Sequence, residues 1–131
     1  MAYMKYKELT KYFNFRKEID TDDLPKYVTD YLVKDENVIS AYKTRKDKGI
    51  FTNKRAILFD LRWFGLIKTI HIVPYKSISS SAIAYKTNKV SLYFSMDSGY
   101  PIKLNFINMS PKGKMHLRKL YAETINKTII E

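Results

Sequence analysis

The segment 38–107 is built from short hydrophobic runs that follow the period of two expected of β-strands. Val90, Leu92, Phe94 and Met96 fall on one face of such a strand. Turn-forming residues interrupt the runs at 53–54, 63–65, 74, 88–89 and 97–99. The predicted strands cover residues 38–44, 50–52, 55–61, 66–73, 78–87, 90–96 and 102–107, with a turn at 46–49 after the first. Alternation of this kind predicts antiparallel sheets that bury one face each.

The C-terminal segment changes to the spacing of a helix. Ser110 is a candidate N-cap and Pro111 suits the first helical position. An apolar stripe without a charged residue follows, made of Leu117, Leu120, Tyr121, Thr124, Ile125, Thr128 and Ile129. A stripe this wide must cover apolar surface, and the open end of a strongly bent sheet is the expected place.

Two further helices are predicted before residue 38. Leu24, Val28, Tyr31 and Leu32 share one helical face, with Pro25 in the first turn. The N-cap candidates of that helix are Thr21, Asp22 and Asp23. Residues 3–19 predict either a short amphipathic helix or an extended segment, because the aromatic cluster at 12–15 suits both.

Composition narrows the class of protein. A chain of 131 residues suits one domain, and 24 Lys and Arg against 13 Asp and Glu give a net charge of +11. Such a charge attracts nucleic acid, anionic lipid or acidic proteins. The absence of cysteine excludes disulfides and thiol chemistry and favours the cytoplasm. The N-terminus has no apolar signal region, and no window reaches the ~18 apolar residues of a membrane span.

Three stretches carry a family resemblance: residues 32–39 (LVKDENVI), 51–55 (FTNKR) and 73–78 (VPYKSI). Together with seven strands and a C-terminal helix, they resemble the bacterial pleckstrin-homology (PH) domain family over residues 20–130. The resemblance implies an α+β, mainly β fold: a bent seven-stranded antiparallel sandwich or barrel, capped by the helix. Residues 1–19 would form an N-terminal helical extension and residues 20–131 the domain. It also implies a non-catalytic scaffold that self-associates and whose grooves suit peptides more than inositol phosphates.

The stretch FTNKR belongs to the first of two basic clusters. Residues 43–55 contain one acid, Asp47, and the basic residues Lys43, Arg45, Lys46, Lys48, Lys54 and Arg55. One interpretation is an anion site, since phosphoinositide-binding PH domains place basic residues in this region. The other is a tight hairpin turn at Asn53-Lys54, flanked by Thr52 and Arg55. We favour the turn and keep Arg55 as a candidate anion ligand.

The second basic cluster opens the C-terminal helix and contains Lys112, Lys114, His116, Arg118 and Lys119. Positive charge at a helix N-terminus opposes the helix dipole, a cost that an anionic partner would offset. A third candidate surface is the hairpin tip with Trp63 and Phe64, which suits contact with a partner.

Catalysis has little support in the sequence. His71 and His116 lie far apart without an acid at a useful spacing, and no phosphate loop, serine elbow or metal motif is present. We therefore predict neither an enzyme nor a cofactor. The leading hypothesis is a bacterial or phage-borne module that docks a protein through Trp63, Phe64 and the edge of the strand at 78–87, and that self-associates. The alternative is a nucleic-acid or anionic-surface binder using both basic clusters, for example a phage inhibitor of a host nucleoprotein machine such as an RNA-guided nuclease.

Overall fold

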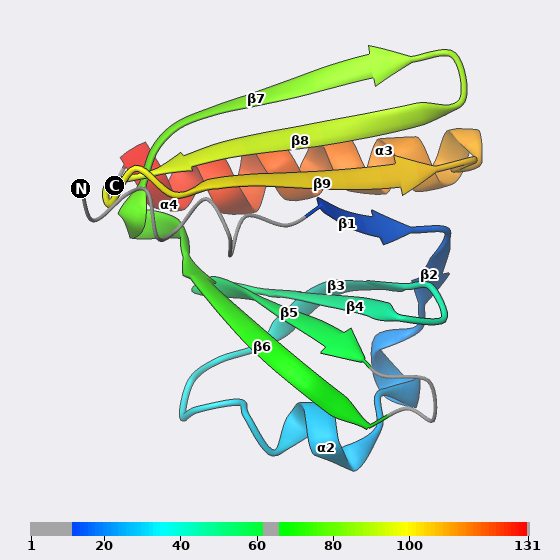
Figure 1. The fold of residues 1–131 in the computed structure, drawn as a ribbon, viewed down its shortest axis with the longest axis vertical. Helices are drawn as coiled ribbons and strands as arrows, with labels where there is room; N and C mark the ends of the chain where they lie inside the picture. Colours follow the sequence, from blue (N-terminus) through cyan, green and yellow to red (C-terminus); the bar gives the residue numbers. More distant parts are fainter. Residues whose placement is uncertain (1–11, 62–65, 131) are drawn as a thin grey trace.

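Two stacked β-sheets and a C-terminal helix make up the computed structural model, which describes residues 12–61 and 66–130 (Figure 1). The four-stranded sheet has the order β1 (Tyr12–Phe15), β9 (Pro101–Ile107), β8 (Lys89–Met96) and β7 (Ile78–Lys86). The five-stranded sheet has the order β2 (Lys17–Ile19), β3 (Val38–Lys43), β4 (Asp47–Thr52), β5 (Arg55–Leu61) and β6 (Ile67–Pro74). A short 3₁₀ turn, η2 (Tyr75–Ser77), joins β6 to β7. The expected mainly β architecture with a terminal helix is confirmed.

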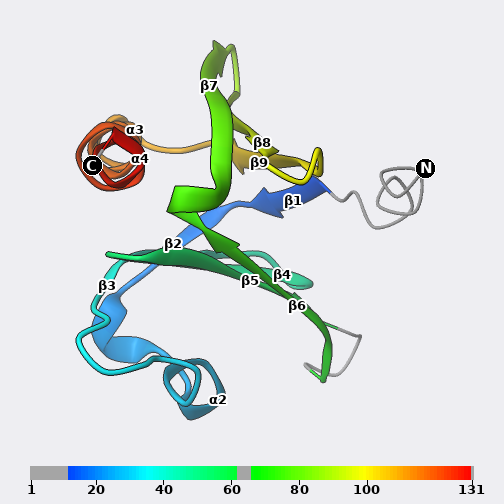
Figure 2. The same cartoon turned by 90° about the vertical axis from the view of Figure 1, so that its left-hand side faces the viewer.

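The C-terminal helix begins where the sequence predicts. The Gly113 N–H donates to the Ser110 hydroxyl at 3.0 Å, and Pro111 occupies the first turn. The helix runs through α3 (Pro111–Lys119), a π-helical segment η3 (Leu120–Ile125) and α4 (Asn126–Ile130). Leu120 and Ile125 lie five residues apart and are both buried, which the wider turn of a π-helix allows. Figure 2 shows the helix nearly end-on beside the two sheets.

Residues 12–15 and 17–19 form strands, so the helix expected for the N-terminal extension is wrong over these described residues. β1 pairs in parallel with β9, and β2 pairs with β3 in the other sheet. Phe13 and Phe15 are buried in the main core, whereas Tyr12 and Asn14 are exposed. The period of two in this aromatic cluster therefore outweighs the helical spacing that also passes through Phe13. Phe13 and Phe15 therefore belong to the same core as side chains of residues 20–131, the range predicted to form the domain.

Gly49 lies inside β4, and the turn predicted at 46–49 is in fact centred on Arg45 and Lys46. A Cβ atom on Gly49 would come within 2.6 Å of Cζ of Phe15. The glycine thus allows the Phe15 ring to pack closely against β4. The sequence pattern alone had suggested that Gly49 belongs to a turn.

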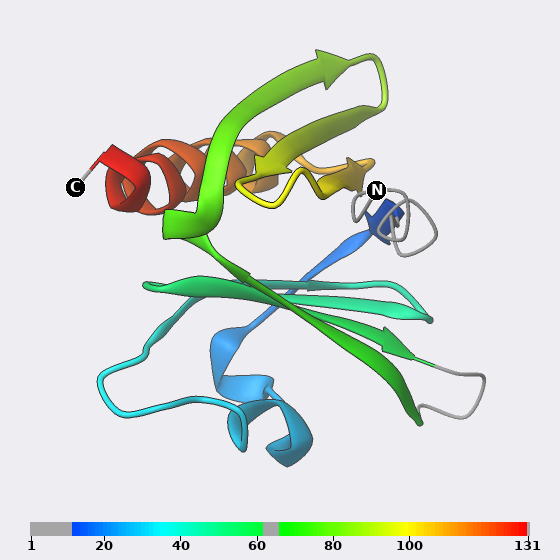
Figure 3. The same cartoon turned by 60° about the vertical axis from the view of Figure 1, so that its left-hand side comes forward.

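The helix predicted around residues 24–32 is present but short. It consists of η1 (Thr21–Asp23) and α2 (Lys26–Thr29), and Figure 3 shows α2 on the side of the five-stranded sheet that faces away from the other sheet. Asp20, rather than a residue of 21–23, caps η1 by accepting from the Asp22 N–H at 3.0 Å. Val28 is fully buried against Ile50, Ile57 and other side chains of that outer face. The molecule therefore has a main core between the sheets and a second core under α2.

Candidate functional site

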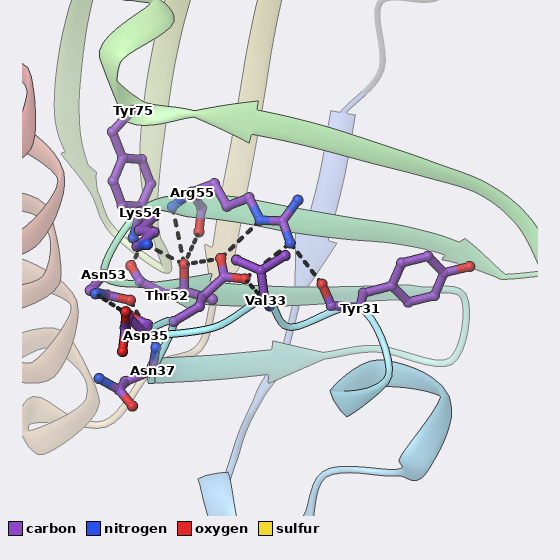
Figure 4. A network of polar contacts seen from close by, with 10 residues as sticks. Tyr31, Val33, Asp35, Asn37, Thr52, Asn53, Lys54, Arg55 and Tyr75 are labelled. Atoms are coloured by element: carbon purple, nitrogen blue, oxygen red, sulfur yellow. Dashed lines mark hydrogen bonds and ion pairs between the residues drawn. The ribbon is translucent and has the colours of Figure 1, made fainter.

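Arg55 of the FTNKR stretch lies in a closed network of polar contacts (Figure 4). Its Nε donates to Oε2 of Glu36 at 2.8 Å and its Nη2 to Oε1 of the same carboxylate at 3.0 Å. The guanidinium also donates to the Tyr31 carbonyl oxygen at 2.7 Å. Glu36 is only 7% exposed. Arg55 is thus held in a bidentate ion pair with a buried carboxylate.

Other donors satisfy the same carboxylate. The Thr52 hydroxyl donates to Glu36 Oε2 at 2.7 Å, and the Val33 N–H donates to Oε1 at 3.0 Å. Burial alone would raise the pKa of Glu36, but the hydrogen bonds from Arg55, Thr52 and Val33 outweigh it and lower the pKa to about 2. The network also reaches Tyr75, whose buried hydroxyl donates to the Thr52 carbonyl at 2.8 Å.

Asn53 joins the turn to the loop that precedes β3. Its Oδ1 accepts from the Asn37 N–H at 2.8 Å and its Nδ2 donates to the Asp35 carbonyl at 3.2 Å. Asp35 adopts a left-handed φ of 65°. The loop 33–37 and the hairpin 52–55 therefore form one hydrogen-bonded unit, and the FTNKR stretch is a braced turn. Of the two basic residues in the FTNKR stretch, Lys54 is exposed and Arg55 is half-buried.

The structure does not bring the six basic residues of 43–55 together. Arg45 and Lys46 lie in the β3–β4 turn, and Lys54 lies in the turn at the opposite end of β4. The six residues of β4 separate these turns by about 20 Å. Lys48 was predicted to lie on a turn, but it lies in β4. Its ammonium donates to the Tyr27 hydroxyl at 2.7 Å. Lys43 is exposed near the end of β3.

The basic cluster of the C-terminal helix is also divided. Lys114 and Arg118 line a groove of about 340 Å³ together with Pro111, Met115 and Tyr85, between α3 and β7. We call this the β7–α3 groove. On another side of the helix, Lys112 and His116 line a hollow of about 480 Å³ with Glu18 and Ile39, among others, and Lys119 lines the next one. The His116 Nδ1 lies 3.1 Å from Glu18 Oε2.

β7 forms an end of its sheet, and it is the outermost strand in Figure 1. Its residues Ile78–Tyr85 include no charged residue and no proline, the usual protections of an exposed strand edge. Near its start the strand is fastened to the helix, since the hydroxyls of Ser81 and Tyr121 lie 2.9 Å apart. The sequence did not single out Tyr85 or Met115, because one exposed aromatic and one methionine carry no pattern of their own.

Trp63 and Phe64, the predicted partner contact, lie outside the described residues. Directly after them, Leu66 and Ile67 are 64% and 39% exposed. Within residues 12–61 and 66–130, no helix is long and apolar enough to cross a membrane. The same part of the chain has no cluster of three or more His, Asp or Glu side chains arranged to hold a metal ion.

Comparison with known proteins gives a consistent result. The model of the family described as "Bacterial PH domain" matches residues 9–123. A crystal structure of a DUF1696-family protein with a PH domain from Shewanella loihica PV-4 superposes with a TM-score of 0.68 at 24% identity, covering 86% of this chain and 98% of that one. A PH domain from Shewanella amazonensis SB2B gives 0.62 at 23% identity, covering 82% and 89%.

Two further similarities are partial. A PH-domain-containing protein from Exiguobacterium sibiricum 255-15 gives a TM-score of 0.61 at 18% identity, covering 89% of this chain and 64% of that one. The curated protein "Uncharacterized protein YozO" of Bacillus subtilis (strain 168) is 48% identical over 52 residues, which is 40% of this chain and 46% of YozO. The aligned part thus spans about half of that relative.

Proposed function

Since this chain belongs to the bacterial PH domain family, we propose that it is a non-catalytic module that docks an extended segment of a partner protein along the edge of β7, which pairs with no strand other than β8 among the described residues. The PH-like fold supports a binding module in general. The observation that carries the more specific proposal is an uncharged strand edge lying next to an open groove. Addition of a strand to such an edge is a recurrent mode of peptide recognition.

The chemistry of the β7–α3 groove selects the type of segment. Tyr85 is 59% exposed and Met115 is 41% exposed, so together they offer apolar contact surface for one side chain of the segment. Lys114 and Arg118 lie one helical turn apart on the same groove wall. An extended peptide with an apolar residue flanked by acidic residues fits both features.

The docking proposal also covers self-association. A second copy of this chain could pair with the same β7 edge, and Trp63 and Phe64 would add apolar contact next to the exposed Leu66 and Ile67. The rival proposal, in which residues 43–55 and 112–119 bind nucleic acid as combined patches, is weakened by the separation of both clusters. We therefore place the partner at β7.

The test uses decapeptides that carry one apolar residue between acidic residues, titrated into the protein labelled with ¹⁵N. We expect binding to slow amide exchange along β7, and Lys114→Glu with Arg118→Glu to weaken affinity roughly tenfold or more. The matched control is Lys68→Glu with Lys127→Glu, which reverses two exposed charges outside the groove.

Equal binding by the groove variant and the wild type would overturn the proposal, as would amide protection confined to other strands. Light scattering separates the two occupants. A concentration-dependent dimer or ring that acidic peptides dissociate places a second copy on β7. If the protein is a monomer and Trp63→Ala with Phe64→Ala leaves peptide affinity unchanged, self-association and the tip contact are both excluded.

A further inference from the structure

A row of alternating aromatic and basic side chains crosses the outer face of the four-stranded sheet. The strand register aligns Tyr12 of β1, Lys103 of β9 and Tyr93 of β8. The Lys103 ammonium lies 5.2 Å from the centre of the Tyr12 ring and 5.3 Å from that of Tyr93. Tyr12 is 62% exposed. Tyr93 and Lys103 are half-buried, so the Tyr12–Lys103–Tyr93 row presents one exposed ring beside a partly exposed cation and a second, partly exposed ring.

The face around the row is positive. Strand alternation places these residues of the four-stranded sheet on its outer face: Tyr12, Asn14, Ala82, Ala84, Lys86, Lys89, Ser91, Tyr93, Ser95, Pro101, Lys103, Asn105 and Ile107. None of these described positions is Asp or Glu. Partial burial alone would raise the pKa of Tyr93, but hydrogen bonds and charge from Lys86 and Lys103 lower it. A local positive potential therefore acts at the ring.

The row continues into a basic groove at one end of the molecule. Tyr12 lines a hollow of about 280 Å³ with Tyr93 and Lys103. It also lines the neighbouring groove of about 550 Å³, whose exposed cations are Arg16, Arg45 and Lys46. The carboxylates of Asp47 and Asp60 also line that groove, although both residues are buried. Tyr12 is thus the residue that joins the aromatic row to the basic groove.

β1 holds Tyr12 in place through polar contacts. The Asn14 N–H donates to Asp47 Oδ2 at 2.9 Å, and Asn105 Nδ2 donates to Asn14 Oδ1 at 3.0 Å. The buried Ser91 hydroxyl donates to Asn105 Oδ1 at 2.8 Å, which extends this network to β8. The rings of the row therefore lie on strands that side chains cross-link, which reduces the cost of ordering the backbone on binding.

We propose that the Tyr12–Lys103–Tyr93 row and the adjoining groove bind single-stranded nucleic acid. Bases stack on the two tyrosine rings, and the phosphates that follow are neutralised by Lys103, Arg16 and Arg45. Exposed rings on a sheet combined with a basic groove are the two components of single-strand recognition. In a duplex the base faces stack on one another, so they are not available to stack on the tyrosine rings. The surface differs from the β7–α3 groove, so the inference is independent of the docking proposal.

The experiment is fluorescence anisotropy at about 150 mM KCl with a labelled oligonucleotide of roughly 12 nucleotides, a matched duplex and an abasic strand of equal charge. We expect the wild type to prefer the single strand roughly tenfold or more over both competitors. Equal affinity for the abasic strand would mean that only the net charge of +11 acts, and this would overturn the proposal.

Variants locate the site. Tyr12→Ala with Tyr93→Ala leaves the charge unchanged, and we expect a loss of roughly tenfold or more, whereas Tyr12→Phe with Tyr93→Phe keeps the affinity. Tyr31→Ala, which removes an exposed tyrosine ring outside both the row and the β7–α3 groove, is the matched control and has no effect. Lys103→Met is compared in the same way with Lys127→Met. If the alanine pair binds like the wild type, or if Lys127→Met weakens binding as much as Lys103→Met, the proposal fails.

Discussion

Arg55 and Arg118 belong to the two basic clusters of the sequence, but the fold places them in opposite surroundings. Arg55 donates through Nε and Nη2 to Glu36 and through Nη2 also to the Tyr31 carbonyl, and its side chain is 22% exposed. Arg118 is exposed, lines the β7–α3 groove and forms no ion pair among the described residues. One arginine stabilises the fold, and the other is open to a partner.

A local excess of cations in the sequence therefore does not define a binding site. A cation becomes part of the fold when a buried carboxylate needs it, because leaving either charge unpaired in the interior is costly. It remains available when its surroundings are apolar and open, as they are beside Tyr85 and Met115. The predictions below therefore separate stability from binding.

The largest expected effect is on stability at Arg55. Replacement by alanine leaves the buried Glu36 carboxylate without its fork, and we expect the free energy of unfolding to fall by about 3–5 kcal/mol. Lys54→Ala, one residue away and exposed, changes it by no more than about 0.5 kcal/mol. Urea denaturation measures both. A loss below about 1 kcal/mol for Arg55→Ala would show that the network is not structural.

The pH dependence of stability should reveal the same network. The pKa of Glu36 is lowered from its ordinary 4.5 to about 2, so the folded state binds this proton less readily than the unfolded chain. Its contribution, about 3 kcal/mol, is complete above about pH 4.5 and is lost as the pH falls towards 2. We expect Glu36→Gln to be less stable at pH 7 and to lose less on acidification. A parallel pH curve for the two proteins would contradict the assignment.

Features that depend on neighbouring residues could be predicted from the sequence, whereas features that depend on contacts between distant residues could not. The strands of residues 55–107 follow from alternation, which each strand carries within itself. The helix start at Ser110 and Pro111 is equally local and is confirmed. The pairing of Arg55 with Glu36 is not local, because it spans 19 residues and requires the left-handed Asp35. The division of the basic clusters has the same cause.

The β1 strand illustrates a different limit. Phe13 fits both a helical stripe and an alternating strand, so the local pattern supports two structures. What decides is the parallel pairing with β9, some ninety residues away, and the space over Gly49 that receives Phe15. No property of residues 12–19 taken alone contains that information. The sequence analysis did not include Tyr12 among its candidate binding residues for the same reason.

Charge reversal at Arg118 and its neighbour Lys114 should have little effect on stability. Lys114→Glu with Arg118→Glu should change the free energy of unfolding by less than about 1 kcal/mol, because both side chains are exposed. Reversing Lys114 removes a positive charge near the helix N-terminus, which is slightly favourable. Thermal unfolding of this variant beside Arg55→Ala makes the contrast directly. A destabilisation of similar size would mean that the groove cations hold α3 to the sheets.

The smallest expected effect concerns the pair of His116 and Glu18. The two side chains lie 3.1 Å apart and each is 36% exposed, so solvent screens their attraction. We expect Glu18→Gln to lower the free energy of unfolding by no more than about 0.5 kcal/mol, against several times that for Glu36→Gln. Both substitutions remove one carboxylate that contacts a basic side chain. They differ in burial and in that partner, because arginine always carries its charge and histidine carries one only when protonated. Equal losses of unfolding free energy in urea denaturation would mean that burial does not distinguish structural charges from exposed, available ones in this protein. The interpretation of Arg118 as open to a partner would then lose its basis.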